Sequence, residues 1–267
     1  MKNWLNLDNK VIIVTGGASG IGKAIVDELI AQQAHVILAD LQNNTDFSQH
    51  HQVTFIKTNV SNKHDIDQLI TTVLDKFGHI DAIVNNAGIN LPRLLVDSKT
   101  PQSQYELSEA DFDRLVNINQ KGAFLLTQAA ARNMVANQHG VIINISSESG
   151  LEGSEGQSAY AATKAAINSF TRSWAKELGK FNVRVVGVAP GILETTGLRT
   201  PAYEDALAYT RNKTVDQLRA DYGKSAIPIG RDGKLSEVAD LVAFLISDRA
   251  SYITGVTYNI SGGKSRG

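Results

Sequence analysis

Tyr160 and Lys164 are the side chains whose types and spacing point most directly to catalysis. They stand four positions apart in a stretch with helical periodicity, so we expect both on one face of a helix. A neighbouring ammonium stabilises a phenolate and lowers the pKa of a tyrosine from about 10 toward neutrality. Such a tyrosine could take a proton from an alcohol or return one to a carbonyl, which is general acid-base chemistry.

The same spacing occurs a second time, at Tyr209 and Lys213, so the pair alone does not identify the site. A hydroxyl residue stands 13 positions before each tyrosine, Ser147 before Tyr160 and Thr196 before Tyr209. The serine follows a predicted strand, where binding sites of parallel sheets form, whereas the threonine lies inside a long connection. We therefore expect catalysis at the first pair and interpret the second as part of a lid.

A glycine-rich turn near the start of the chain predicts a site for a dinucleotide. The segment 15–22, Thr-Gly-Gly-Ala-Ser-Gly-Ile-Gly, follows an apolar run typical of a buried strand and opens a stretch with helical periodicity. Glycines let the backbone turn tightly and approach a pyrophosphate, whose charge the N-terminus of the helix stabilises. The residues expected to contact the cofactor here are Gly16, Ser19, Gly20, Ile21 and Gly22.

Asp40 predicts which dinucleotide binds. It ends the second predicted strand, and a carboxylate there can accept hydrogen bonds from both hydroxyls of the adenosine ribose while repelling a 2′-phosphate. Neither Ser19 nor residues 41–49 supply an arginine or lysine that could hold such a phosphate. We therefore expect NAD as the cofactor; a helix-capping or surface role for Asp40 is the alternative.

Two further predicted strands end in residues suited to a dinucleotide. Asn59 and Val60 follow the third strand, where an adenine could rest, and Asn86, Ala87 and Gly88 follow the fourth. Amide side chains could brace the strand ends, and small residues would let a cofactor approach the backbone. An Asn-Asn-Ala-Gly sequence alone is only a plausible turn, but its position after a buried strand indicates the cofactor site.

The elements that must position these residues alternate between strand and helix along the whole chain. Alternation of this kind predicts an α/β fold, a doubly wound Rossmann-type parallel sheet of about seven strands with helices on both faces. We expect one NAD-binding domain over 1–267, with a substrate-covering insertion near 191–228 that has helical patches at 203–222. The predicted strands are 11–15, 36–39, 53–56, 82–84, 141–145, 184–188 and 256–260, and the predicted helices are 21–32, 65–77, 111–134, 159–178 and 236–245.

Composition excludes several other classes of function. The 267 residues include no cysteine, which removes disulfides, thiolate metal sites and a cysteine nucleophile. None of the six histidines stands in a metal-binding pattern, so we expect no metal. A formal charge of −1 argues against nucleic acid or an anionic membrane as a partner. No apolar run reaches membrane-helix length, and the first residues lack the apolar core of a signal peptide, so we expect a cytoplasmic protein.

Taken together, these motifs resemble those of the short-chain dehydrogenase/reductase family over essentially the whole chain. The residues that carry the resemblance are Thr15 to Gly22, Asp40, Asn85 to Gly88, Asn119, Ser147, Tyr160, Lys164 and Pro190-Gly191. Asn59 departs from the family, which often has an aspartate there. The resemblance also implies a homotetramer, and a face of small residues at Ala161, Ala162, Ala165 and Ala166 would permit close packing of helices.

The resemblance implies a role for each matching residue. Ser147 would hydrogen-bond the substrate oxygen, Tyr160 would be the acid-base group, and Lys164 would bind the nicotinamide ribose and lower the pKa of the tyrosine. Asn119 would hold a water in the proton relay, with Asn117 as its rival. The residues implied around the nicotinamide are Pro190, Gly191, Ile192, Leu193 and Thr195.

Family membership would imply hydride transfer but not the substrate. Segments such as 92–97 and 146–157 resemble a branch of the family that acts on sugar-alcohol phosphates, which implies a small-molecule substrate of that class. Of the cations near the predicted site, Arg93 is our first choice for the phosphate and Arg199 the second. The full predicted set of substrate residues is Arg93, Ser147, Ser149, Glu155, Tyr160 and Arg199. A 3-oxoacyl reductase and a redox-sensing binding protein without turnover remain alternatives.

Overall fold

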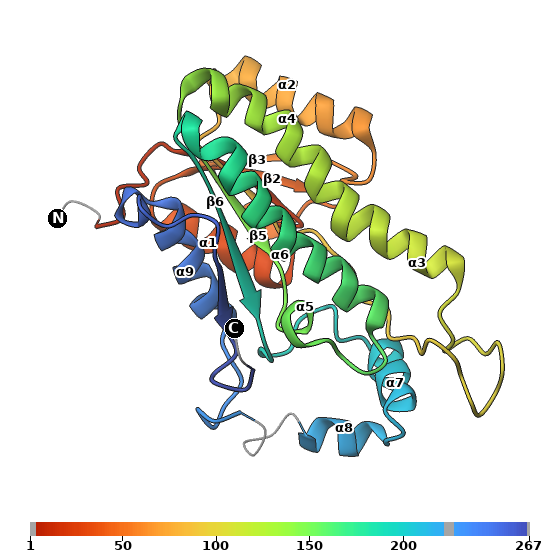
Figure 1. Cartoon of the computed structure of the whole chain (residues 1–267). Helices are drawn as coiled ribbons and strands as arrows, with labels where there is room; N and C mark the ends of the chain where they lie inside the picture. Colours follow the sequence, from red (N-terminus) through yellow and green to blue (C-terminus); the bar gives the residue numbers. More distant parts are fainter. Residues whose placement is uncertain (1–3, 222–226, 266–267) are drawn as a thin grey trace.

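Seven parallel strands form a single sheet in the order β3-β2-β1-β4-β5-β6-β7 (Figure 1). The computed structural model describes residues 4–221 and 227–265. The predicted α/β fold with a parallel sheet of about seven strands is confirmed. The strands are β1 Val11–Thr15, β2 His35–Asp40, β3 Val53–Lys57, β4 Ala82–Asn85, β5 Gly140–Ile145, β6 Val183–Pro190 and β7 Thr257–Ile260.

Helices cover both faces of the sheet, as expected for right-handed crossovers between parallel strands. Helices α1 and α9 pack on one face, and α2, α4 and α6 pack on the other (Figure 1). The helices are α1 Gly20–Ala31, α2 Lys63–Phe77, α3 Glu109–Leu115, α4 Gly122–Asn137, α5 Ser149–Glu152, α6 Ser158–Leu178, α7 Pro201–Thr210, α8 Val215–Asp221 and α9 Leu235–Ile246.

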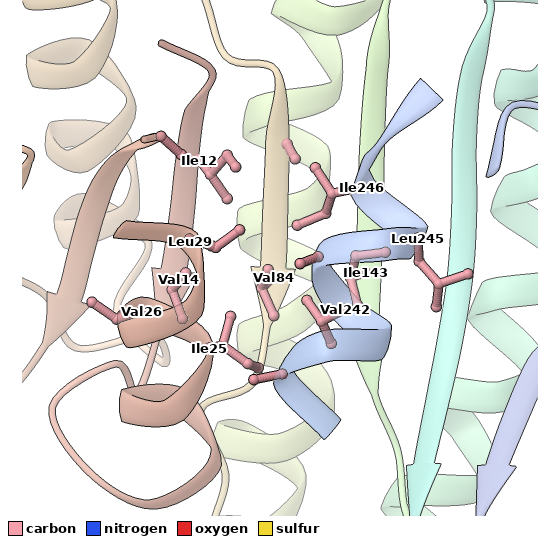
Figure 2. Close-up of a cluster of buried hydrophobic side chains, with 14 of the residues drawn as sticks. Ile12, Val14, Ile25, Val26, Leu29, Val84, Ile143, Val242, Leu245 and Ile246 are labelled. Atoms are coloured by element: carbon pink, nitrogen blue, oxygen red, sulfur yellow. The ribbon is translucent and has the colours of Figure 1, made fainter. Parts of the chain in front are cut away.

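Strand β1 shows why its sequence is apolar without alternation. Successive side chains of a strand point to opposite faces. Ile12 and Val14 pack in the cluster under α1 and α9, drawn in Figure 2, whereas Val11 and Ile13 pack in the cluster under α2, α4 and α6. Because both faces are covered, all five residues of β1 are buried.

The strand order reverses between β1 and β4, which places a crevice at the carboxyl ends of these two strands. The long connection after β6 contains α7 and α8, which lie beyond that end of the sheet (Figure 1). The helical patches expected near 203–222 are therefore present at 201–210 and 215–221, while Tyr222 lies outside the described residues.

The helix predicted over 111–134 is interrupted. Between α3 and α4 the six residues Val116–Lys121 form a π-helical segment, a wider turn that is frequent at functional sites. Asn119 lies in this segment and is 2% exposed, whereas Asn117 is exposed. The wider turn carries Asn119, the predicted relay residue, with its side chain toward the interior.

Candidate active site

A cavity of about 670 Å³ lies at the carboxyl ends of the strands and collects most of the predicted site residues on its wall. Its lining runs from the glycine-rich turn past β4 and β5 to helix α7 and the C-terminal tail. The predicted residues that line it are Gly16, Ser19, Gly20, Ile21, Gly22, Asp40, Asn59, Val60, Asn86, Ala87, Gly88, Ser147, Ser149, Tyr160, Lys164, Pro190, Gly191, Ile192, Leu193 and Arg199.

The glycine-rich turn is packed so closely that two of its glycines have no room for a side chain. A Cβ on Gly22 would lie 2.0 Å from the carbonyl oxygen of Gly16, and one on Gly16 would lie 2.9 Å from the Cα of Ala87. Gly16 also has a φ of 64°, which favours glycine. Asn86 Nδ2 donates to the carbonyl oxygens of Thr15 and Gly16 at 2.9 and 3.1 Å, which ties the turn to the end of β4.

Asp40 is joined to the same turn. Its Oδ2 accepts a hydrogen bond from the backbone N–H of Ala18 at 3.0 Å, and the residue lines the cavity at the end of β2. The lysines and arginines on the described lining are Lys164, Arg199, Arg211 and Lys264, so none comes from residues 16–60. The carboxylate of Asp40 is therefore the only charged side chain that residues 16–60 contribute to the described lining.

Tyr160, Lys164 and Ser147 meet on the cavity wall. Lys164 is 5% exposed, and its Nζ donates to the carbonyl oxygen of Ile145 at 2.8 Å. The Nζ lies 5.8 Å from the centre of the Tyr160 ring. Ser147 Oγ is 2.8 Å from Ser149 Oγ, so the two hydroxyls share a hydrogen bond beside the tyrosine.

Burial dominates the protonation of the pair. It raises the pKa of Tyr160, with a smaller opposite effect from a hydrogen bond to Ser147, and it lowers the pKa of Lys164 to about 8. The expectation that the ammonium would lower the pKa of the tyrosine is not met in this structure. Burial of the phenol has the largest effect on its pKa, and the ammonium of Lys164 makes its hydrogen bond to the Ile145 carbonyl and not to the tyrosine.

Asn119 is not on the described lining of the main cavity. It lines a smaller neighbouring cavity that shares Lys164 with the main one. Its Oδ1 accepts from the N–H of Ile89 at 2.8 Å, and its Nδ2 donates to the Ile89 carbonyl at 2.9 Å and to Thr163 Oγ1 at 3.1 Å. A second, small cavity of about 10 Å³ is lined by Asn119 and Lys164. That volume is close to the minimum that holds one water molecule, as the predicted relay would require.

Besides Asn119, three predicted residues are not on the described lining of the main cavity. Arg93 Nε donates to Asp111 Oδ2 at 2.9 Å and its Nη1 donates to the carbonyl oxygen of Pro92 at 2.8 Å, so the guanidinium is held against α3. The side chain of Glu155 is exposed and absent from the wall. Thr195 is also exposed, and its neighbour Thr196 lines the cavity instead, opposite Gly20.

The second tyrosine–lysine pair is placed elsewhere. Tyr209 lies on α7, where its hydroxyl donates to Asp97 Oδ2 at 2.8 Å and its ring stacks on Tyr105 with centroids 4.0 Å apart. Tyr209 is not on the described lining of the cavity. Helix α7 nevertheless covers the site, because Tyr203 and Leu207 of the same helix line the wall.

Several lining residues were absent from the predicted set. Polar residues among them include Asn90, Glu148, Gln157, Tyr203, Arg211 and Lys264. Asn90 follows the Asn-Asn-Ala-Gly turn by two residues and Gln157 precedes Tyr160 by three, so distance from a motif along the chain could have indicated both. Tyr203 and Arg211 belong to the connection that was expected to cover the substrate, but its sequence does not predict which of its residues reach the wall.

Comparisons with known proteins agree with this geometry. The family model described as short chain dehydrogenase matches residues 10–206. The chain is 64% identical to sorbitol-6-phosphate 2-dehydrogenase of Klebsiella pneumoniae over 267 residues, covering all of both chains. It is 37% identical to a 3-oxoacyl-[acyl-carrier-protein] reductase of Thermotoga maritima, covering 97% of this chain and 99% of that one. The crystal structure of the 3-ketoacyl-(acyl-carrier-protein) reductase from Brucella melitensis complexed with NADH superposes with a TM-score of 0.80, at 28% identity over 98% of this chain and 100% of that one.

Proposed function

The chain belongs to the short-chain dehydrogenase family, and we propose that it interconverts D-sorbitol 6-phosphate and D-fructose 6-phosphate with NAD. The observation that carries this proposal is the 64% identity, without unmatched ends, to the Klebsiella sorbitol-6-phosphate 2-dehydrogenase. Oxidation at carbon 2 of sorbitol 6-phosphate converts that alcohol to the ketone of fructose 6-phosphate.

The glycine-rich turn and Asp40 fit a nicotinamide dinucleotide. The backbone of the turn can approach a pyrophosphate because Gly16 and Gly22 present no side chain, and the N-terminus of α1 faces the same cavity. The carboxylate of Asp40 would accept hydrogen bonds from the adenosine ribose hydroxyls and repel a 2′-phosphate, which favours NAD over NADP. When bound, the nicotinamide supplies the acceptor or donor of a hydride.

The chain itself supplies the proton transfer. Tyr160 would take the hydroxyl proton of the alcohol during oxidation and return it to the carbonyl oxygen during reduction. Ser147 would orient the same substrate oxygen by a hydrogen bond, since it lies on the wall beside Tyr160. Lys164 would bind the nicotinamide ribose. Asn119 would hold a water molecule in the small cavity that it lines together with Lys164, and this water would extend the proton relay from the lysine.

Arg211 replaces Arg93 as our first choice for the phosphate. Its Nη2 donates to Ser154 Oγ at 3.2 Å and its Nε to the carbonyl oxygen of Glu155 at 3.5 Å, both uncharged groups. Lys264, also on the wall, is instead neutralised by Glu148, with Nζ 2.7 Å from Oε1. Within the described residues Arg211 therefore bonds neutral oxygens only, so its charge is available to a phosphate. Arg199 remains our second choice.

A 3-oxoacyl reductase is the second candidate because relatives of that function share up to 37% identity with the chain. Several polar side chains on the wall, including Asn90, Gln157 and Glu148, favour a hydroxylated substrate over an acyl chain. Activity with acetoacetyl thioesters would favour this second candidate. A binding protein without turnover would produce no NADH from any alcohol.

A homotetramer in the cytoplasm is part of the proposal. Phe112 and Phe124 are 45% and 39% exposed on α3 and α4, and Ala162 and Ala165 are exposed on α6. Tyr252 is fully exposed, and Val256 and Tyr258, close to it in the sequence, are 46% and 36% exposed. Exposed apolar residues gathered on these elements are typical of subunit contacts. No helix within residues 4–221 and 227–265 is long and apolar enough to span a membrane.

The test is a spectrophotometric assay of NADH formation with a panel of sugar alcohols and their phosphates. We expect sorbitol 6-phosphate to be oxidised with the highest kcat/KM. Faster turnover of another polyol, or of acetoacetyl thioesters in the reverse direction, would overturn the substrate assignment while leaving the fold and family intact.

A further inference from the structure

Helix α7 covers the cavity without belonging to the core of the sheet. Its side chains Leu207 and Ala208 pack with Leu218 of α8 in a small apolar cluster. This cluster is separate from the two buried clusters that pack on the faces of the sheet. Contacts with other segments therefore fix where α7 lies over the cavity.

The two sides of α7 meet different surroundings. Tyr203, Leu207 and Arg211 line the cavity and stand four residues apart, a spacing that places them on one side of a helix. Tyr209 stands two residues after Leu207, about 200° around the helix, and is not on the described cavity wall. Tyr209 therefore makes its contacts on the side of α7 that faces away from the cavity.

The partner of Tyr209 is a buried carboxylate in the segment 94–107, drawn in yellow beside α7 in Figure 1. The hydroxyl of Tyr209 donates to Asp97 Oδ2 at 2.8 Å, and Asp97 is 1% exposed. Ser103 Oγ donates to the same oxygen at 2.6 Å, and the backbone N–H of Lys99 donates to Oδ1 at 3.0 Å. The bond from Ser103 has the largest effect on the pKa of Asp97 and, with the bond from Tyr209 and against burial, lowers it to about 2. The acceptor is therefore charged at neutral pH, which strengthens the bond from Tyr209.

The segment 94–107 also contacts the end of α7 in two other ways. The ring of Tyr105 stacks on the ring of Tyr209 with centroids 4.0 Å apart. Lys99 Nζ lies 4.9 Å from the centre of the Tyr209 ring and donates to Asn212 Oδ1 at 2.8 Å. The segment is itself closed by a backbone hydrogen bond, from the N–H of Leu94 to the carbonyl oxygen of Tyr105 at 2.7 Å. It can therefore support α7 from outside the cavity.

The contacts on the inner side of α7 depend on what the cavity holds. Arg211 Nη2 donates to Ser154 Oγ at 3.2 Å, and Gln157 Nε2 donates to the hydroxyl oxygen of Tyr203 at 3.0 Å. All four of these residues line the cavity. A phosphate that binds Arg211 would compete with Ser154 for the guanidinium. The bond from Tyr209 to Asp97 lies outside the described wall, so an occupant of the cavity does not compete for it.

We propose that Asp97 and Tyr209 are positioning residues whose hydrogen bond, here called the latch, holds α7 over the cavity so that Arg211 meets the phosphate of the substrate. This inference rests on the proposed function, because it gives Arg211 a phosphorylated substrate. When the latch is broken, α7 covers the cavity in a smaller fraction of the molecules, and the apparent affinity for the substrate falls by that fraction. The complex that does form has the same catalytic groups, so its turnover changes little.

The test is Tyr209→Phe, which removes the hydroxyl of the latch and keeps the ring that stacks on Tyr105. We expect the KM for sorbitol 6-phosphate to rise about threefold or more, while kcat and the KM for NAD stay close to the wild-type values. Tyr105→Phe is the matched control, because it removes a hydroxyl from the same stacked pair and leaves the bond to Asp97 in place. Its KM for sorbitol 6-phosphate should equal that of the wild type.

A double-mutant cycle tests whether the latch acts through Arg211. In Arg211→Ala, closure of α7 brings no charge to the substrate, so adding Tyr209→Phe should raise the KM for sorbitol 6-phosphate much less than it does in the wild type. An equal rise with and without Arg211 would overturn the inference. Asp97→Asn, which removes the charge that strengthens the bond from Tyr209, is the second variant and should raise the KM in the same direction.

Hydrogen exchange tests the latch without any substrate. The amides of α7 should exchange faster in Tyr209→Phe than in the wild type or Tyr105→Phe, while the strands of the sheet keep their protection. If exchange and KM in Tyr209→Phe both match the wild type while the enzyme oxidises sorbitol 6-phosphate, the latch is wrong and the proposed function stands. If the wild type oxidises no sugar-alcohol phosphate, the proposed function fails and the role of Arg211 in this inference fails with it. Faster exchange of α7 in Tyr209→Phe would still support the latch in that case.

Discussion

Lys164 Nζ donates its hydrogen bond to the carbonyl oxygen of Ile145 at 2.8 Å, while the centre of the Tyr160 ring lies 5.8 Å from the same nitrogen. The hydrogen bond of the lysine therefore goes to the backbone of β5 and not to the tyrosine. Burial disfavours the charged form of each group. Tyr160 is therefore a neutral phenol at neutral pH, and Lys164 loses its proton more readily than an ordinary lysine does.

Replacing Tyr160 by phenylalanine should abolish turnover while NAD binding survives, because the ring remains and the proton carrier is lost. NADH formation and NAD titration measure the two properties separately. Tyr209→Phe is the control, since its hydroxyl bonds Asp97 outside the described cavity wall, and it should keep substantial activity. An inactive Tyr209→Phe beside an active Tyr160→Phe would reverse our assignment of the two motifs.

The raised pKa of Tyr160 predicts different pH dependences of kcat/KM for oxidation and for reduction. Oxidation needs the tyrosine as a base, so its kcat/KM should increase with pH between about pH 6 and 8. Reduction needs the protonated phenol, which is present throughout that range, so its kcat/KM should stay nearly flat. Initial rates in both directions across buffers of constant ionic strength test this; an oxidation profile independent of pH would contradict it.

The lowered pKa of Lys164 predicts that this residue destabilises the folded chain at neutral pH. Its pKa is about 8 when folded against an ordinary value of 10.5, so between those values the unfolded chain binds the additional proton. The destabilisation is complete below about pH 8 and disappears as pH rises toward 10.5. Lys164→Met should therefore be inactive yet more stable than the wild type at pH 7, by on the order of 3 kcal/mol at most.

Denaturant unfolding of both proteins at pH 7 and near pH 10 measures this difference. The advantage of the methionine variant should shrink at the higher pH. An advantage that grows with pH, or a variant less stable than the wild type at pH 7, would show that the Lys164–Ile145 hydrogen bond outweighs the burial of the ammonium.

Asp40 should set the preference for cofactor. We expect the wild type to prefer NAD over NADP by at least about tenfold in kcat/KM, equivalent to about 1.4 kcal/mol. Asp40→Ala should narrow the gap, mainly by weakening NAD, and the KM for the sugar substrate should change little. Equal use of both cofactors by the wild type would refute the role of Asp40.

Arg211→Ala should raise the KM for sorbitol 6-phosphate by about tenfold or more, the loss expected from one charge-assisted contact. Arg93→Ala is a matched control, because it removes an arginine that is paired with Asp111 and absent from the described cavity wall. Its KM for the same substrate should barely change. Comparable kcat/KM for sorbitol and its phosphate in the wild type would show that the enzyme has no phosphate site. An unchanged KM in Arg211→Ala would show only that Arg211 does not bind the phosphate.

The sequence by itself determined the sheet, the cofactor turn and the catalytic helix, because each depends on residues close together in the chain. The run at 11–15 is apolar at every position, which indicates a strand buried on both faces, and β1 is such a strand. Tyr160 and Lys164 share one helix face through a spacing of four residues, whatever surrounds them. Motifs of this local kind also carry the family resemblance.

Only the tertiary structure decided the surroundings of those motifs. The sequence favoured Arg93 as the phosphate-binding cation, yet packing places Arg93 beside Asp111 and places Arg211 on the cavity wall. The pKa of Tyr160 depends mainly on how deeply the folded chain buries the phenol, whereas the spacing of the motif draws attention only to the neighbouring lysine. Asn90 Nδ2 donates to the hydroxyl oxygen of Tyr203 at 3.4 Å, a contact between the connection after β4 and helix α7. Contacts between segments so distant in the chain follow from the packing of whole elements, and no local period encodes them.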